Sequence, residues 1–299
     1  MREFRKLALG ASVLVLALSA CSTGGGSATV KIGSDGFDEA RVVAEIYAQA
    51  LEAAGFTVDR AGIGAGTRAV TKAALEANEI NIKPEYIGSG LVAYGGEATN
   101  NGDTNRQRLQ EKLTPLGITV LNFTPGQDTN AFVVRKETAD QYGTRLSDYA
   151  AVQNELKWAF ATGCPTNPLC AAALKSAYGL EPTDVTLLDA CSTPMADALK
   201  NETVDVAELC STGPEIIVNG WVRLDDDKQT QPADHIAPIV RNDLLAAVDR
   251  AKFEKTLNDV SAKIDTATLA QLYYDVSVGR KDLADVASTW LRLVGLVTG

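Results

Sequence analysis

Hydrophobic residues recur along this chain in short blocks that predict alternating helices and strands. In the block 43–54 they return every three or four positions and stop at Gly55, which predicts an amphipathic helix. Short β-branched or apolar runs predict strands at 29–33, 56–58, 80–83 and 118–123. The strand at 80–83 is expected to stop at Pro84, and the glycine-rich stretch 62–66 is expected to be a loop. Further helices are predicted at 67–78 and 106–113.

A second series of the same kind follows residue 128. Strands are predicted at 131–135, 158–162, 185–188, 204–209 and 236–241. Helices are predicted at 169–178 and 195–200, and again in the tail from Phe253 onward. Strands that alternate with helices predict an α/β fold, with parallel sheets covered by helices on both faces. A chain of 299 residues is also longer than one hydrophobic core usually supports, which favours two lobes.

The first 21 residues have the layout of an export signal. Arg2, Arg5 and Lys6 precede an apolar run at 7–17, which is too short to remain as a membrane span. The following Leu-Ser-Ala-Cys resembles the lipobox of bacterial lipoproteins, in which the cysteine is acylated. We therefore expect a signal peptide at 1–20, a lipidated Cys21 and a flexible tether at 21–28. The protein would then be extracytoplasmic and anchored to the outer face of the cell membrane; an ordinary signal peptide with an accidental cysteine is the alternative.

Composition and charge exclude several classes of function. The formal net charge of −10 argues against nucleic acid and against anionic lipid as partners. Gly88-Ser89-Gly90 lacks the spacing of a nucleophile elbow, so the chain is not expected to be an enzyme. A single histidine and the absence of a C-x-x-C spacing argue against a zinc site. We expect neither a metal nor a cofactor.

Four cysteines besides Cys21 suggest disulfide bonds in an oxidising compartment. They allow three pairings, and the sequence alone does not choose between them. Cys164 and Cys170 enclose a short loop broken by two prolines, which favours a local bridge. Cys191 and Cys210 each end an apolar segment, so that they can meet at one edge of a sheet. We expect these two bonds.

Six stretches, in order and at a characteristic spacing, resemble one family of proteins. They are Lys31-Ile32-Gly33-Ser34 with Glu45 to Glu52, Pro84-Glu85-Tyr86-Ile87-Gly88, Ala131 to Lys136, Ala198 to Asn201, Val204 to Ala207, and Ala237 to Arg241. The chain is similar to the solute-binding lipoproteins of ABC importers that capture glycine betaine, choline and related quaternary amines. The most specific of the six is Pro-Glu-Tyr followed by a glycine.

This resemblance implies two α/β lobes that are joined by two crossing strands, with the ligand in the cleft between them. One lobe would comprise residues 29–127 and 235–299, and the other residues 128–234. The protein would be a monomer that closes over a small solute and delivers it to the permease subunits of the importer. A lipoprotein of the same fold that acts as a sensor or binding module without transport is the alternative.

The resemblance also places the ligand site, and there the sequence departs from the family. Quaternary amines are usually held by a cage of aromatic rings, because such cations cannot donate hydrogen bonds. Tyr86 keeps the first cage position, and Ser89 a hydroxyl position. The other positions fall on residues with no aromatic ring, namely Asn130, Cys210 and Asp234, with Asp128 in place of an asparagine and Ala40 in place of a glutamine. If the alignment slips by one residue, the substitutes are Phe37, Arg41, Phe132 and His235. For Asn130 and Asp234, a role as solvated hinge residues remains open.

Overall fold

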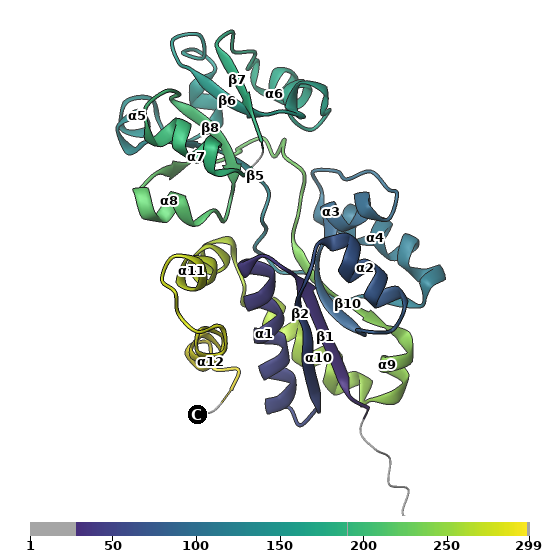
Figure 1. The fold of residues 1–299 in the computed structure, drawn as a ribbon. Coiled ribbons are helices and arrows are strands. Elements are labelled where there is room, and N and C mark those ends of the chain that lie inside the picture. The colour runs from purple at the N-terminus through teal and green to yellow at the C-terminus, as the bar shows by residue number, and fades with distance from the viewer. Residues whose placement is uncertain (1–27, 190, 298–299) are drawn as a thin grey trace, which may run out of the picture.

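The computed structural model describes residues 28–189 and 191–297, which form two lobes of similar design (Figure 1). The predicted signal peptide, Cys21 and most of the tether lie outside the described residues. Each lobe is built on a five-stranded sheet. In the part of the chain that is described, no helix is both long and apolar enough to cross a membrane.

The first lobe, lobe I, combines the beginning and the end of the chain. Its strands lie in the order β2-β1-β3-β10-β4. Their bounds are β1 Val30–Asp35, β2 Val58–Gly66, β3 Ile82–Tyr86, β4 Ile118–Val120 and β10 Ile236–Arg241. Its helices are α1 Asp38–Ala53, α2 Arg68–Glu76, α3 Ile87–Ala93, α4 Gly102–Leu113, α9 Asn242–Ala247, α10 Arg250–Ser261, α11 Thr266–Ser277 and α12 Leu283–Leu293, with a 3₁₀ turn at Thr114–Leu116.

The second lobe, lobe II, is made from the middle of the chain. Its strands lie in the order β7-β6-β8-β5-β9. Their bounds are β5 Asn130–Val134, β6 Trp158–Ala161, β7 Val185–Leu188, β8 Val206–Cys210 and β9 Val222–Arg223. Its helices are α5 Lys136–Tyr142, α6 Ala171–Tyr178, α7 Thr193–Lys200 and α8 Pro214–Asn219, with 3₁₀ turns at Leu146–Tyr149 and Cys164–Thr166.

The two-lobed α/β architecture was expected, but the sheets are mixed rather than parallel as predicted. In lobe I, β10 is antiparallel to both β3 and β4. In lobe II, β5 is antiparallel to both β8 and β9. Both strands enter their sheet directly from the other lobe rather than after a helix within the same lobe. Parallel pairing requires a crossover connection, usually a helix, between two strands of one sheet. Because β5 and β10 follow no such connection, they can pair antiparallel.

The glycine-rich stretch 62–66 is part of strand β2 and not the loop that was predicted. Gly62 pairs with Gly33 of β1. A β-carbon on Gly62 would lie 2.6 Å from the Ile80 side chain, and one on Gly33 would lie equally close to it. The two glycines therefore let the paired strands pass beneath Ile80, which a side chain at either position would prevent.

Strand β3 also continues past Pro84, where the sequence predicted that it would stop. Pro84 faces Pro238 of β10 in the antiparallel register. The neighbouring pair Ile87 and His235 is hydrogen-bonded, with the Ile87 N–H 2.9 Å from the His235 carbonyl. Because hydrogen-bonded pairs alternate with unbonded ones, the two prolines meet at an unbonded pair, so the ladder between β3 and β10 needs no N–H from either of them. The strand consequently extends to Tyr86.

Helix α1 is the centre of the lobe I core. Eleven of its residues are buried, since it is covered by the sheet on one side and by α10, α11 and α12 on the others. Even the Tyr47 hydroxyl has a hydrogen-bond partner within the core, since it lies 2.8 Å from the hydroxyl of Ser261. This packing fixes the N-terminal end of α1, which points toward lobe II (Figure 1).

The two crossing segments run side by side between the lobes. Gln127 and His235 form an antiparallel bridge. One residue further on, the Asp128 N–H donates to the Asp234 carbonyl over 3.1 Å. Residues 127–130 and 231–235 therefore form a narrow two-stranded connection, and both lobes present side chains to it.

Candidate functional site

All six residues that the resemblance assigned to ligand contact lie near the junction of the lobes. Tyr86 ends β3 and Ser89 lies in the first turn of α3, both in lobe I. Asp128 and Asp234 lie on the two crossing segments. Asn130 begins β5 and faces Cys210, the last residue of β8, in lobe II. The fold thus brings together residues that are up to 148 positions apart in the sequence, from Tyr86 to Asp234.

Tyr86 makes two contacts with the start of α1. Its hydroxyl donates to Glu39 Oε1 over 2.6 Å. Its ring lies against that of Phe37, with 5.7 Å between the ring centroids and a tilt of 37°. Tyr86 is only 4% exposed, whereas Phe37 is 40% exposed. Phe37 was a possible substitute in the sequence, and the structure places it beside the first cage position.

Glu39 is one residue of this site that the sequence did not reveal. Its side chain is completely buried. Burial, followed by the nearby charge of Asp128, raises the pKa of its carboxyl to about 8. Oε1 accepts from Tyr86, but Oε2 has no hydrogen-bond partner among the described residues. An acidic residue in the first turn of a helix has an ordinary explanation in the helix dipole, so it gave no sign of a second role.

Asp128 lies next to Glu39, on the first crossing segment. Burial is the main cause of its raised pKa, which nearby groups of Thr212 and Ser211 partly offset. Its Oδ1 atom is shielded from solvent and has no partner among residues 28–189 and 191–297. Lobe I, a crossing segment and lobe II therefore each contribute a polar group to one small region.

Asp234 is held by lobe I rather than being free in the cleft. Its Oδ1 accepts from the backbone N–H groups of Gly88 and Ser89 over 2.8 and 3.0 Å. Its Oδ2 accepts from the Ser89 hydroxyl over 2.5 Å. Burial raises its pKa to about 6, although these donors act in the opposite direction. A β-carbon on Gly88 would lie 2.6 Å from the Ala233 carbonyl, which explains the glycine of the Pro-Glu-Tyr motif.

Both disulfide bonds expected from the sequence are present in lobe II. Cys164 pairs with Cys170, and Cys191 pairs with Cys210. The second bond lies at the end of β8, so that it fixes the strand end that faces Asn130. Cys210 presents a disulfide sulfur at this position, which is neither a thiol nor an aromatic ring.

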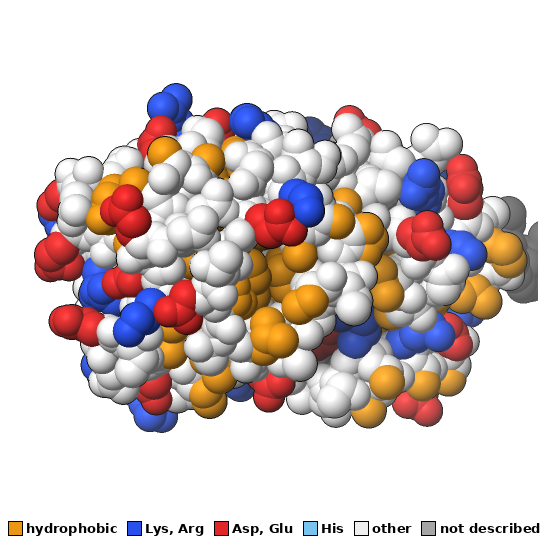
Figure 2. Space-filling view, turned by 90° about the horizontal axis from the view of Figure 1, so that it is seen from above, with side chains coloured by type: hydrophobic (Ala, Val, Ile, Leu, Met, Phe, Trp, Pro, Cys, Tyr) orange, Lys and Arg blue, Asp and Glu red, His pale blue; other side chains and the backbone are white. Residues whose placement is uncertain are grey.

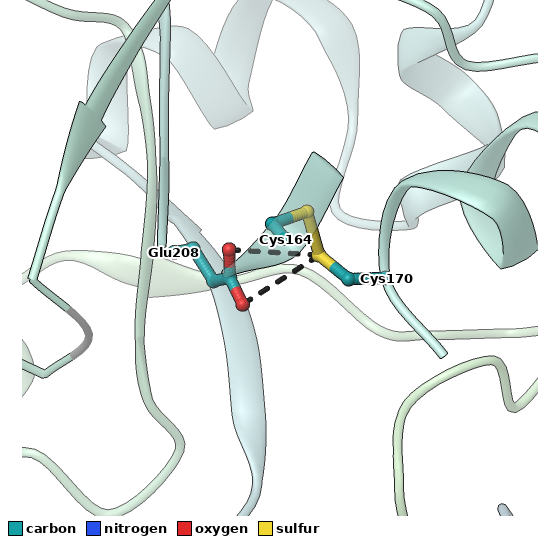
Figure 3. A group of neighbouring side chains, drawn as sticks. All are labelled: Cys164, Cys170 and Glu208. Carbon is teal, nitrogen blue, oxygen red and sulfur yellow. Dashed lines mark hydrogen bonds between the residues drawn. A yellow bond between two sulfur atoms is a disulfide. The ribbon is translucent and has the colours of Figure 1, made fainter. Parts of the chain in front are cut away.

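The buried bond Cys164–Cys170 lies against the carboxyl of Glu208 (Figure 3). The ligand atoms of these three residues lie within 4.8 Å of one another, a spacing that suits a metal ion. However, both sulfurs are engaged in the disulfide and are not thiolate ligands. The Cys170 sulfur lies 3.7 Å from both carboxyl oxygens. Since a disulfide sulfur carries no proton, any hydrogen bond here is donated by Glu208, whose pKa is raised by burial.

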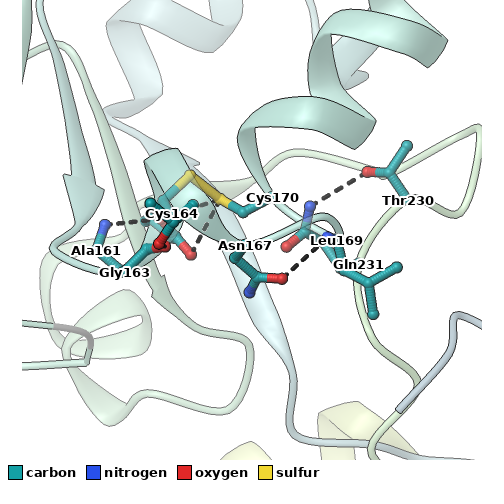
Figure 4. The surroundings of a disulfide bond; sticks show 10 residues. Ala161, Gly163, Cys164, Asn167, Leu169, Cys170, Thr230 and Gln231 are labelled. Atoms are coloured by element: carbon teal, nitrogen blue, oxygen red, sulfur yellow. Dashed lines mark hydrogen bonds between the residues drawn. A yellow bond between two sulfur atoms is a disulfide. The ribbon is translucent and has the colours of Figure 1, made fainter. Parts of the chain in front are cut away.

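The surroundings of this bond are held by short local contacts (Figure 4). The Ala161 N–H donates to Glu208 Oε2 over 2.8 Å. The Leu169 N–H donates to the Asn167 side chain over 2.9 Å, within the loop that the disulfide closes. This group stabilises the lobe II loop at the end of β6.

A cavity of about 530 Å³ lies between the lobes, beside the crossing segments. Its lining includes Asn130 and Phe132 of lobe II and His235 of lobe I, but not Tyr86, Glu39 or Asp128. His235 packs on Phe123 with 4.7 Å between the ring centroids, and its Nδ1 lies 3.1 Å from the Gly126 carbonyl. The cavity and the Tyr86 cluster are thus two different regions of the interlobe junction.

The outer surface seen from above carries charges of both signs. There, acidic and basic side chains are interspersed, and hydrophobic ones form a band near the middle (Figure 2). No continuous basic patch covers this face, in keeping with the acidic composition.

A two-lobed fold with buried polar groups at the junction of its lobes is typical of solute-binding proteins. The protein-family model that describes the substrate-binding domain of ABC-type glycine betaine transport systems matches residues 28–293. The chain therefore belongs to this family of substrate-binding proteins.

Individual relatives agree with the family. The glycine betaine-binding protein YehZ of Escherichia coli is 28% identical over 281 residues, which cover 89% of this chain and 90% of that protein. The carnitine transport binding protein OpuCC of Listeria monocytogenes is 25% identical over 309 residues, which cover 97% and 94% of the two chains. The solved structure of apo YehZ superposes with a TM-score of 0.78 at 25% identity, covering 90% of this chain and all 100% of that one.

The high pKa of Glu39 leads to a prediction about stability. A carboxyl with a pKa of about 8 in the folded state and 4.5 otherwise takes up a proton on folding, so the stability that its neutral form contributes is lost as the pH rises toward 8. We expect Glu39→Gln, which stays neutral, to match the wild type near pH 4.5. At pH 8 the variant should be more stable by about 2–5 kcal/mol.

Thermal or urea unfolding of both proteins from pH 4.5 to 9 measures this difference. Glu45→Gln, on the same helix, is the control, because Glu45 is paired with Arg60 at 3.0 Å. A gap between Glu39→Gln and the wild type that does not widen with pH would contradict the account.

Proposed function

We propose that this protein is the lipid-anchored receptor of an ABC importer and that it captures a small polar or cationic solute between its lobes. The proposal rests chiefly on the acidic cluster at the junction, where Glu39 and Asp128 lie beside Tyr86. Among the described residues, neither carboxyl has an ion pair with lysine, arginine or histidine within 4.0 Å. A positively charged solute would supply the missing countercharge.

The relatives narrow the choice of solutes to test. Their names mention glycine betaine and carnitine, which both carry a trimethylammonium group. In this chain Asn130, Cys210 and Asp234 occupy positions where the family resemblance expects aromatic rings. Each well-placed cation–π contact contributes about 0.5–2 kcal/mol, so the loss of several rings weakens the binding of a bare trimethylammonium group by orders of magnitude. Glycine betaine is therefore expected to bind weakly, and Tyr86 to stack on a better ligand.

A thermal-shift screen tests the proposed function, since a ligand that binds only the folded state raises the melting temperature. The screen would contain betaines, choline, carnitine, polyamines and aromatic or thiol-containing metabolites, and calorimetry would follow each hit. We expect at least one cationic or hydroxylated solute to bind more tightly than glycine betaine. If glycine betaine binds at micromolar or tighter affinity, and this is lost in Tyr86→Ala but unchanged in Asp234→Ala, the site assignment is wrong.

The proposed cellular role has further parts. The protein would be monomeric and extracytoplasmic, held at the outer face of the cell membrane through Cys21. It would deliver its solute to permease subunits and catalyse no reaction. Solute uptake that persists after deletion of the gene, with binding intact in the purified protein, would instead favour a sensor of the same fold.

The anchor makes a prediction of its own. We expect Cys21→Ala to leave the membrane fraction while keeping the melting temperature of the wild type, because the tether separates Cys21 from the first strand at Val30. Stable attachment requires acyl chains, which alanine cannot carry. Cell fractionation and thermal unfolding measure the two effects. Membrane association of the Cys21→Ala protein after its signal has been cleaved would contradict the lipid anchor.

A further inference from the structure

Three buried oxygens without partners lie at the junction of the lobes. They are Glu39 Oε2, Asp128 Oδ1 and Thr212 Oγ1, and they make up most of the five buried side-chain atoms that lack a hydrogen bond in the described residues. Glu39 and Thr212 are completely buried. Leaving a buried polar atom unpaired costs about 1–3 kcal/mol, so three in one place indicate that something else satisfies them.

The three atoms belong to different parts of the fold. Glu39 is in α1 of lobe I, Asp128 is on a crossing segment, and Thr212 follows β8 in lobe II. The Thr212 hydroxyl is near enough to both carboxyls to lower their pKa values, yet it makes no hydrogen bond to either in this structure. A molecule that bridges these atoms would therefore connect the two lobes directly.

Each of the three atoms can accept a hydrogen bond, and two belong to carboxyls. A bound molecule that satisfies all three as acceptors must donate several hydrogen bonds, and a positive charge on it would pair with the two carboxylates once Glu39 has released its proton. A primary ammonium group has three donors and a guanidinium group has five, whereas a trimethylammonium group has none. The Phe37 and Tyr86 rings can cover one side of such a cation without competing for its donors.

We infer that the interlobe site takes a cation with N–H donors, a primary amine or a guanidinium, which Glu39 and Asp128 anchor together with Thr212. This inference rests on the proposed function and deepens it, since it names the class of solute. In this mode of binding, charge-assisted hydrogen bonds hold the cation, whereas an aromatic cage holds a quaternary amine through contacts with its methyl groups.

Proton release accompanies this mode of binding. The cation needs ionised carboxyls, while the pKa of Glu39 is about 8 without it. As the pH rises toward 8, the proton on Glu39 competes less with the cation, so the affinity for the cation rises by up to about tenfold per pH unit. The ionisable groups that interact electrostatically with Glu39 or Asp128 are Tyr86 of β3, Asp234 of the second crossing segment, Glu215 of α8 and Tyr273 of α11.

A series that removes one N–H donor at a time tests the inference. The probes are ethanolamine, its N-methyl and N,N-dimethyl derivatives, and choline, titrated by calorimetry at pH 7 in two buffers that differ in ionisation enthalpy. Affinity is expected to fall along the series, with choline at least tenfold weaker than ethanolamine. Ethanolamine binding should release a proton, which the two buffers reveal as different apparent enthalpies.

Variants locate the effect. Glu39→Gln is expected to weaken ethanolamine at least tenfold and to change choline less than twofold, while Glu45→Gln on the same helix changes neither. Choline binding as tightly as ethanolamine, or ethanolamine binding unchanged in Glu39→Gln, overturns the inference but leaves the proposed function standing. If no probe binds, and glycine betaine and carnitine also fail to bind, the proposed function falls and the inference falls with it.

Discussion

A Lys83→Met variant is expected to lose about 3–5 kcal/mol of its free energy of unfolding. Lys83 is completely buried in β3. Its ammonium nitrogen lies 2.8 Å from Asp35 Oδ1 and 3.1 Å from Glu85 Oε2. It also donates to the Thr71 hydroxyl over 2.8 Å. Methionine is unbranched and only one atom shorter than lysine, but it removes the charge, which leaves two buried carboxylates facing each other.

This network also supports the candidate site. Glu85 Oε1 accepts from the Tyr86 N–H over 3.0 Å, and from Arg68 over the same distance. Loss of Lys83 is therefore expected to disturb the strand end that carries Tyr86. Arg68 is partly exposed and cannot replace a buried ammonium group between the two acids.

Urea unfolding of Lys83→Met and the wild type measures the loss. Lys136→Met is the matched control, because Lys136 also pairs with a carboxylate, at 2.6 Å from Asp140, but its side chain is 65% exposed. Such a surface pair contributes about 0–1 kcal/mol. Equal effects of the two substitutions would show that the buried network does not stabilise the fold as described.

Removal of the Cys191–Cys210 bond is expected to lower the free energy of unfolding by roughly 3 kcal/mol. The bond closes a loop with a sequence separation of 19, so it limits the unfolded chain considerably. Cys191 is exposed, and Cys210 is half-buried at the end of β8. A Cys191→Ala and Cys210→Ala double variant therefore leaves little cavity, and the loss reports mainly the constraint on the unfolded chain.

Chemical unfolding of the double variant and the wild type, both without reductant, measures this effect. The single variant Cys191→Ala is the control, since it breaks the same bond and should lose a similar amount. Free energies of unfolding within 0.5 kcal/mol of the wild type, about the usual range for a surface substitution, would contradict the proposed constraint.

The fold was predictable in outline because its signals are local. The period of the apolar residues in α1 and the β-branched run before it indicate the first strand and helix without knowledge of the tertiary structure. The errors arose where residues distant in the sequence determine the local conformation. Gly62 belongs to a strand because Ile80 packs over it, and Pro84 stays in a strand because Pro238 faces it.

The candidate site was predictable only in part for the same reason. The family motif located Tyr86, and short-range features favoured the disulfide pairs. The partner of Tyr86, however, is Glu39, 47 residues earlier, and no sequence pattern links the two. Likewise, Asp234 was assigned to the ligand, but its carboxylate binds Gly88 and Ser89, which are 146 and 145 residues away. Only the folded structure brings these pairs together.

A crystal structure with the tightest-binding amine tests the central claim most directly. The account predicts the solute between the lobes, with its charged nitrogen within hydrogen-bond distance of Glu39 and Asp128 and its body against Tyr86. A solute found instead in the 530 Å³ cavity beside His235, with Glu39 Oε2 and Asp128 Oδ1 still lacking hydrogen-bond partners, would contradict it.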